Sequence, residues 1–448
     1  MKYFLATLLL VNSAFASDSF LKSVKKIKWK DMDVVWIEDD KFPKFTASIY
    51  FQDGALGEAV PGTTQLAFDQ LTSGTSKENQ RQLAEFFDFY GANLRRSVTH
   101  EYSVFSVQAL TKDIKPVIGK VCEIFNDAQY PKEELSSHIS RMKSQLRNLV
   151  TSHGALADRV FRKISLANTA YANPVEGNLE SFDKITSESL KTRLQALNKT
   201  RKVLYLAGPS EVKNIREVIE ENCHWKNEIQ SVPQKLSKPS EQSAIYLVEV
   251  PNANQAQIRI GRYLTESEFE GKHDKFQFMA SFLGGGFTSK LIQELRVKRG
   301  LTYSAGAYAS MQRDYGRAGI STFSKNETAA ETIALIREIL GDVAGGKFQE
   351  KEFTHQINHE MGGYAFGFEQ MNAFLGQLML YDHQGRKYDE LINYPDVISK
   401  MTRSELSSSA MEVFKWSKET IVVVGDKALE KSLSKIRPVR VIKYEDYL

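Results

Sequence analysis

The stretch that decides how this chain is interpreted is LGGGFTSKLIQELRVKRGLTY, residues 283–303. Three glycines, Gly284, Gly285 and Gly286, precede a segment with helical periodicity, which ends in a basic cluster. A Gly-Leu turn then leads to Tyr303. A phosphate-binding loop is excluded, because this stretch lacks the G-x-x-x-x-G-K-[ST] spacing that cradles phosphates. A tight turn that requires positive φ is one explanation of the glycines.

Two segments far apart in the chain resemble each other. They read FDKITSESLKTRLQALNKTRKVLYLAGPSEV at residues 182–212 and ISKMTRSELSSSAMEVFKWSKETIVVVGDKAL at residues 398–429. In each, a Thr predicted to cap a helix is followed by a β-rich run. A second pair, residues 44–55 and 255–266, alternates as half-buried strands do. Two pairs in the same order indicate an internal duplication.

The duplication predicts two domains of the α+β class, each a mostly antiparallel sheet with helices packed on one face. We place the first domain at residues 18–225 and the second at 246–448. The segment between them, residues 226–245, is polar and contains prolines and serines, and it is interpreted as a linker. A chain of 448 residues is long enough for more than one hydrophobic core.

The N-terminus has the pattern of an export signal. Lys2 precedes an apolar run at residues 4–11, and Ala14-Phe15-Ala16 fits the small-residue cleavage rule. We therefore predict a signal peptide at residues 1–16 and a periplasmic or otherwise exported protein. No later apolar run reaches about 18 residues, so the mature chain is expected to be soluble, without a membrane anchor. The net charge of +4 does not indicate nucleic acid as a partner.

The only cysteines are Cys122 and Cys223. An oxidising compartment would permit a bridge between them, but their spacing alone cannot show one. We favour two buried thiols. Two cysteines this far apart form no zinc motif.

The motif at residues 283–303 resembles the second-half signature of the pitrilysin, or insulinase-type, metallopeptidases, which include the mitochondrial processing peptidases. The matching positions are Leu283, Gly284, Gly286, Ser289, Leu291, Leu295, Arg296, Gly300, Leu301 and Tyr303. The resemblance implies that Arg296 and Tyr303 reach a zinc site, contact the substrate carbonyl and stabilise the tetrahedral intermediate, as a guanidinium and a phenol can. It also implies that Gly284–Gly286 contact substrate, which is the alternative to a tight turn.

The zinc motif of that family is missing from this chain. Active members carry H-x-x-E-H, in which two His bind zinc and the Glu activates water. The corresponding stretch is PGTTQLAFDQLTSGT, residues 61–75, in which Gln65, Phe68 and Asp69 replace these groups. Residues 135–157, where a third ligand is expected, contain no Asp or Glu. The first domain is therefore predicted to bind no catalytic zinc.

Another pair of histidines has zinc-like spacing. His355 and His359 are four residues apart on a predicted helix, but Gln356 occupies the place of the catalytic Glu and no third ligand is evident. We interpret them as surface histidines. The alternative is an autonomous hydrolase that uses this pair.

Together these features predict the zinc-less subunit of an exported heterodimeric metallopeptidase. A homologous partner would supply zinc, and this chain would supply Arg296, Tyr303 and half of the peptide chamber. The substrate would be an unfolded peptide, bound as an added strand on the partner's sheet edge. The alternative is a catalytically inert structural or peptide-binding member of the family.

Overall fold

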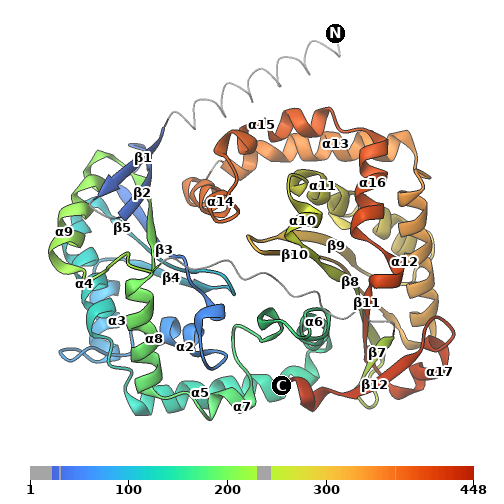
Figure 1. Ribbon diagram of the computed structural model, residues 1–448, viewed down its shortest axis with the longest axis horizontal. Coiled ribbons are helices and arrows are strands. Elements are labelled where there is room, and N and C mark those ends of the chain that lie inside the picture. Colours follow the sequence, from blue (N-terminus) through green and yellow to red (C-terminus); the bar gives the residue numbers. More distant parts are fainter. Residues whose placement is uncertain (1–22, 30–31, 230–243, 369) are drawn as a thin grey trace, which may run out of the picture.

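The computed structural model describes residues 23–29, 32–229, 244–368 and 370–448 (Figure 1). The predicted signal peptide lies outside these residues, as do residues 230–243 of the predicted linker. The domain boundaries given above remain predictions. None of the helices in the described part is both long and apolar enough to cross a membrane.

The first half of the chain forms a six-stranded sheet in the order β1-β2-β6-β3-β5-β4. Its pairs are antiparallel except for β2 and β6, which run parallel. The strands are β1 (Val24–Trp29), β2 (Met32–Glu38), β3 (Lys44–Phe51), β4 (Asn93–Val98), β5 (Ser103–Leu110) and β6 (Lys202–Gly208).

The second half forms a six-stranded sheet in the order β12-β7-β11-β8-β10-β9. Here β7 runs parallel to β11 and β12, and the other pairs are antiparallel. The strands are β7 (Ile245–Glu249), β8 (Gln255–Thr265), β9 (Ala305–Met311), β10 (Tyr315–Lys325), β11 (Thr420–Gly425) and β12 (Val439–Lys443). Apart from β1 and β12, the two sheets have the same strand order, which confirms the predicted α+β duplication.

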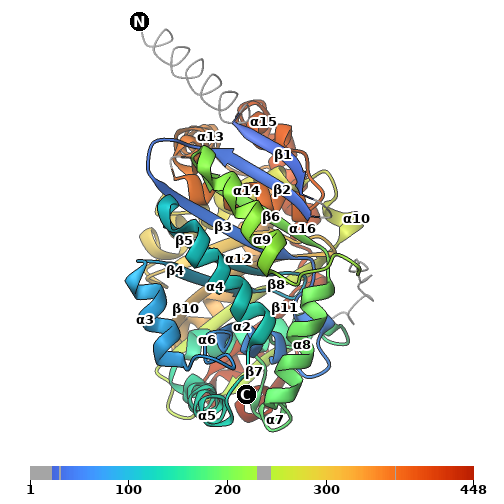
Figure 2. The same cartoon turned by 90° about the vertical axis from the view of Figure 1, so that its left-hand side faces the viewer.

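Helices of each half cover the outer face of that half's own sheet (Figures 1 and 2). In the first half these include α2 (Thr63–Asp69), α3 (Gln80–Phe89), α4 (Ile114–Asp127), α5 (Lys132–Arg147), α8 (Ser187–Lys199) and α9 (Ile215–Asn222). In the second half they include α11 (His273–Gly284), α12 (Ala329–Ala344), α13 (Glu350–Tyr364) and α16 (Arg403–Val413). Shorter or peripheral helices are α7 (Leu179–Phe182), α10 (Glu266–Phe269), α15 (Tyr388–Ser399) and α17 (Glu430–Leu433).

The repeated helices α8 and α16 begin at the predicted threonines. The side chains of Thr186 and Thr402 accept hydrogen bonds from the backbone amides three residues later, both at 3.2 Å. Each forms a capping box, because the side chain at the third helical position returns a bond to the cap's own amide. Local sequence therefore fixes where these two helices start.

The inner face of each sheet is covered by a helix from the opposite half. In β2, Val34 and Trp36 pack into the first half's own core, whereas Val35 and Ile37 pack against α14 (Met371–His383). In β7, Tyr246 and Val248 likewise pack against α6 (His153–Ser165). Figure 1 shows both helices near the middle of the molecule, between the two sheets. Strands that are apolar on both faces need helices on both faces of the sheet. The sequence led us to expect helices on one face only.

A buried polar cluster also joins the halves. The carboxylate of Glu101 lies 2.7 Å from His383 Nε2 and accepts a hydrogen bond of 2.9 Å from the Tyr171 hydroxyl. It also accepts hydrogen bonds from the backbone amides of Arg313 and Asp314. Burial alone would raise the pKa of Glu101, but the hydrogen bond and charge of His383 outweigh it, so the pKa lies below its usual value. Because the hydrogen-bond donors to Glu101 come from both halves, Glu101 helps to fix the position of one half relative to the other.

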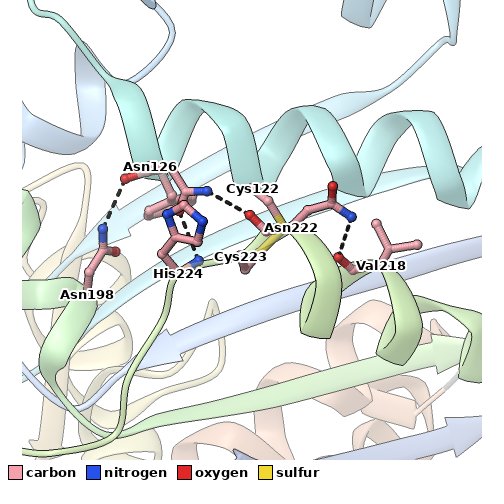
Figure 3. Close-up of a disulfide and its surroundings, with 8 residues drawn as sticks. Cys122, Asn126, Asn198, Val218, Asn222, Cys223 and His224 are labelled. Carbon is pink, nitrogen blue, oxygen red and sulfur yellow. Dashed lines mark hydrogen bonds between the residues drawn. A yellow bond between two sulfur atoms is a disulfide. The ribbon is translucent and has the colours of Figure 1, made fainter.

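The preference for two free thiols was wrong. Cys122, on α4, and Cys223, which follows α9, form a disulfide that joins these helices across a sequence separation of 101 residues (Figure 3). Beside it, the Asn126 side chain donates to the Asn222 carbonyl at 2.7 Å and accepts from the His224 amide at 3.0 Å. The spacing could not reveal the pair, because only the packing of α4 on α9 brings the two cysteines together.

Candidate functional site

The motif at residues 283–303 connects α11 to β9. Helix α11 ends at Gly284, and residues 292–297 form one π-helical segment that carries Arg296. Gly300 then adopts a φ of 62°, which glycine tolerates without strain. The amide of Leu301 closes this turn on the carbonyl of Leu295, at 2.8 Å. The turn returns the chain so that Tyr303 lies beside Arg296.

Arg296 and Tyr303 are in contact. The guanidinium carbon of Arg296 lies 4.5 Å from the centre of the Tyr303 ring and 5.6 Å from that of Phe287. Tyr303 is 72% exposed and Phe287 is 78% exposed, so the stack stands on the surface. Within the part of the chain that the structure describes, no side chain hydrogen-bonds the Arg296 guanidinium or the Tyr303 hydroxyl. The N–H groups and the phenol therefore remain available to another molecule.

The neighbouring cations, in contrast, are paired. Lys298 Nζ lies 2.7 Å from one oxygen of Glu294, and Arg299 Nη1 lies 3.0 Å from the other. Burial would raise the pKa of Glu294, but the hydrogen bonds from Lys298 and Arg299 lower it overall. Arg296 is thus the one arginine of this basic cluster that Glu294 does not hold.

The three glycines have separate roles. Gly284 lies against β9, where a Cβ would come within 2.0 Å of the Ala307 amide nitrogen. At Gly285 a Cβ would meet the Ser281 hydroxyl at 2.3 Å, whereas at Gly286 it would meet nothing within 4 Å. None of the three has a positive φ, so the explanation by a positive-φ turn was wrong. Close packing explains the first two, and Gly286 leaves its backbone open.

The three positions of the lost zinc motif lie on α2. Phe68, in place of the catalytic Glu, is fully buried and packs edge-on against Phe51 and Phe125, with ring centres 5.7 and 6.3 Å away. Gln65 donates a hydrogen bond of 2.9 Å to Asp69, so the substitutes for the two His satisfy each other. At the positions of the zinc motif, Phe68 is therefore part of the hydrophobic core, and Gln65 and Asp69 are hydrogen-bonded to each other.

Two further residues, His138 and Arg96, lie near Asp69, and neither was singled out as a site residue from the sequence. His138 of α5 places Nε2 3.9 Å from an Asp69 oxygen, and Arg141 approaches the other ring nitrogen at 3.4 Å. Arg96 of β4 is close enough for the Asp69 charge to influence its pKa, which burial lowers. Burial also lowers the pKa of His138. Only the packing of α5 and β4 on α2 brings these side chains together.

No group of three or more His, Cys, Asp or Glu side chains is positioned to hold a metal ion among the described residues, which fits a zinc-less chain. His355 and His359 lie exposed on α13. Gln356, between them, points inward and donates to Ser281 and Glu360, both at 2.9 Å. The second zinc-like pattern is therefore a solvent-facing pair.

Comparison with known proteins identifies the family to which both halves of the chain are similar. Residues 34–179 match the family model of insulinase (peptidase family M16), and residues 184–359 match that of the peptidase M16 inactive domain. A Bacillus subtilis protein named uncharacterized zinc protease YmxG is 22% identical over 347 residues, 75% of this chain and 82% of that protein. The Helicobacter pylori protein named non-peptidase homolog YmxG is 20% identical over 434 residues, 96% of this chain and 100% of that protein.

The fold is also found among solved structures. The crystal structure of a peptidase M16 inactive domain from Pseudomonas fluorescens superimposes with a TM-score of 0.80 at 19% identity, covering 90% of this chain and 98% of that one. Taken with the two family matches and the duplicated sheets, this shows that the chain belongs to the insulinase (M16) peptidase family.

Proposed function

We propose that this chain is the zinc-less subunit of an exported heterodimeric metallopeptidase. The observation that carries the proposal is the Arg296–Tyr303 stack, which is exposed and has no hydrogen-bonding side chain within the described residues. In the same chain, the positions of the zinc motif hold Gln65, Phe68 and Asp69. One half of a catalytic site is present and the other half is to come from a homologous partner carrying H-x-x-E-H and zinc.

The chemistry of the pair suits peptide hydrolysis. When water attacks a peptide carbonyl, negative charge develops on the carbonyl oxygen, and prearranged donors stabilise that charge most in a site that excludes water. The guanidinium presents several N–H donors in one plane, and stacking on Tyr303 restricts how that plane can turn. The partner's zinc would activate the water and polarise the carbonyl. Arg296 and Tyr303 would hydrogen-bond the oxyanion.

The substrate would be an extended, unfolded peptide that adds a strand to the edge of the partner's sheet. Gly286 stands at the open end of the glycine segment, where a Cβ would meet no atom within 4 Å. The backbone there is accessible to a peptide lying across the motif. This chain would thus form one wall of the chamber in which cleavage takes place.

Export is supported by the disulfide as well as by the N-terminal pattern. Disulfides persist in oxidising compartments and are rare in the cytosol. The Cys122–Cys223 bridge therefore favours an exported protein, and the signal-peptide pattern at residues 1–16 favours the periplasm.

A second candidate is a catalytically inert structural or peptide-binding protein. It is favoured by the relative named a non-peptidase homolog, which aligns with 96% of this chain. The Arg296–Tyr303 stack favours the subunit instead, because Tyr303 is largely exposed and Arg296 is only half-buried, so the pair contributes little to the stability of the fold.

Co-expression tests the proposal. The chain is produced with an exported homologue that carries H-x-x-E-H, preferably one encoded next to it, and the complex is purified through a tag on this chain. Zinc is measured in the complex and in each chain alone, and peptide hydrolysis is followed for the native chain, Arg296→Ala, Tyr303→Phe and the control Lys298→Ala. We expect zinc only where the partner is present and loss of hydrolysis only in the Arg296 and Tyr303 variants.

Stoichiometric zinc on this chain alone would overturn the proposal and favour an autonomous hydrolase. A stable complex in which both variants hydrolyse peptide as well as the native chain does would leave the inert protein as the better reading.

A further inference from the structure

A partly open pocket of about 390 Å³ lies between the two halves. The first half contributes the turn after β4, helix α6 and the side chain of Gln65, and the second half contributes strands β9 and β10. Gln65 stands where the first zinc-binding His would be. The pocket therefore occupies the inner side of the lost metal site.

Two arginines line this pocket from opposite halves. Arg162 lies on α6 and Arg317 on β10. Within the described part of the chain, neither guanidinium forms an ion pair or a hydrogen bond, and the Nε of Arg317 is buried without a partner. Arginine stays protonated at all ordinary pH values. A buried donor on a permanent cation that has no acceptor is costly, so this arrangement favours binding of an anion.

The two carboxylates in the pocket wall are already engaged. Glu101 accepts hydrogen bonds from Tyr171, His383 and two backbone amides, as described above. Glu176 is held by Arg159, with Nη1 and Oε1 2.9 Å apart. Among the described residues, neither carboxylate forms an ion pair with Arg162 or Arg317.

The effect of the two positive charges is visible on a neighbouring side chain. His100 also lines the pocket, and its pKa is lowered to about 4. Burial is the largest cause, and the charges of Arg162 and Arg317 add to it, while the hydrogen bond to the Asn173 carbonyl opposes it. The part of this shift that comes from Arg162 and Arg317 shows that both positive charges act at the pocket, where they would attract an anion.

The strands around the pocket suit a peptide as the bearer of that anion. β4 and β9 are the end strands of their sheets, so each has one edge without a neighbouring strand among the residues that the structure describes. The pocket is reached at the end of β4 and along β9, where it is lined by Tyr308 and Ser310. An extended peptide can hydrogen-bond such an edge through its backbone while one of its end or side groups enters the pocket.

We propose that this pocket binds a carboxylate of a peptide through Arg162 and Arg317. The carboxylate would be either a C-terminal carboxylate or an Asp or Glu side chain, since both offer the same pair of oxygens to a guanidinium. The wall on which the family's active members hold a cation would in this chain receive an anion. The inference rests on the pocket alone and does not require the zinc-bearing partner.

The test uses the complete chain without a partner and four fluorescein-labelled decapeptides. The peptides are built of Ala, Thr and Val around one central Glu or Gln, each with a free or an amidated C-terminus. Fluorescence anisotropy gives their dissociation constants at low and at high salt. We expect at least one carboxylate-bearing peptide to bind about tenfold or more tightly than the neutral Gln amide, as charge-assisted hydrogen bonds imply. Tight binding of the Glu amide would identify a side-chain site, and tight binding of the Gln free acid a C-terminal site.

Arg162→Gln and Arg317→Gln should each remove most of that preference and leave binding of the neutral peptide unchanged. Arg81→Gln is the matched control, because the Arg81 side chain is 82% exposed on α3. Equal binding of all four peptides to the native chain would overturn the proposal without any variant. So would a loss in folded Arg162 and Arg317 variants that is the same for neutral and charged peptides, since the two arginines would then make no contact specific to a carboxylate.

Discussion

The two halves of this chain differ in how they pack the positions that correspond to the family's two sequence motifs. In the first half, Phe68 is fully buried in the core and Gln65 is hydrogen-bonded to Asp69. In the second half, Arg296 is stacked on Tyr303 at the surface, and the donors of both are unoccupied within the described residues. One site is closed by its own packing and the other is open. The substituted zinc-motif positions are thus absorbed into the core and its hydrogen bonds, whereas the Arg296–Tyr303 motif keeps its polar groups accessible.

The largest effect should come from restoring the acidic group to the closed site. Phe68→Glu removes an aromatic ring that packs against Phe51 and Phe125 and places a carboxyl in its stead. We expect unfolding in urea to show a loss of about 5 kcal/mol or more, combining the cavity and the buried carboxyl. Gln65→His, on the pocket side of the same helix, should cost under about 1 kcal/mol. A Phe68→Glu chain as stable as the native one would show that the site is not closed by packing.

A smaller effect, on catalysis and not on stability, is expected in the open site. In the complex with a zinc-bearing partner, Arg296→Ala should lower kcat about 10²- to 10³-fold, the usual result of removing one oxyanion donor. KM should change little, because the donor acts mainly in the transition state. Lys298→Ala, which loses only the ion pair to Glu294, should stay within about twofold. Steady-state kinetics decide, and a change confined to KM would contradict the assigned role.

The disulfide extends the comparison, because it lies wholly in the first half. Cys223→Ser should destabilise the chain by about 3 kcal/mol, since the bridge closes a long loop in the unfolded state. Chemical unfolding with and without dithiothreitol provides the control. Reductant should destabilise the native chain by a similar amount and leave Cys223→Ser unchanged. A native chain indifferent to reductant would mean that the bridge does not hold α4 to α9.

The smallest effect concerns the pocket between the two halves, where His100 is buried. Its pKa falls from 6.5 to about 4 on folding, so the unfolded chain binds the proton first as pH drops. Stability is therefore lost as pH falls from 6.5 towards 4, by about 2 kcal/mol between pH 7 and pH 5. In His100→Asn, the loss of unfolding free energy between pH 7 and pH 5 should be smaller by that amount. His273, whose pKa is also lowered to about 4, remains as an internal reference in both chains. An unchanged slope would contradict the burial of a neutral His100.

Features written in local patterns were accessible from the sequence. The alternation in residues 44–55 and 255–266 predicted β3 and β8, and Thr186 and Thr402 predicted the starts of α8 and α16. The Gly-Leu turn before Tyr303 was also visible in the sequence, and in the structure Gly300 adopts a φ of 62° there. In each case the residues that decide the structure are close together in the chain.

Features created by the approach of distant segments were not accessible. The Cys122–Cys223 bridge, the contact of Glu101 with His383 and the meeting of Arg162 with Arg317 in one pocket all depend on how elements pack. The glycines show the same limit. Glycine is required at position 284 because a Cβ there would clash with the neighbouring strand β9, and not because of the backbone angles of Gly284. A positive-φ turn was therefore the wrong explanation.

The exchange of helices α6 and α14 has a consequence for how the chain folds during its synthesis. The first sheet is complete once β6 has emerged at Gly208, but the helix that covers its inner face begins only at Met371. Until then, one apolar face of that sheet is bare, and it is a surface on which a nascent chain can aggregate. Each half therefore needs a helix of the other half to finish the cover of its sheet, and a half expressed alone is expected to aggregate more readily than the complete chain.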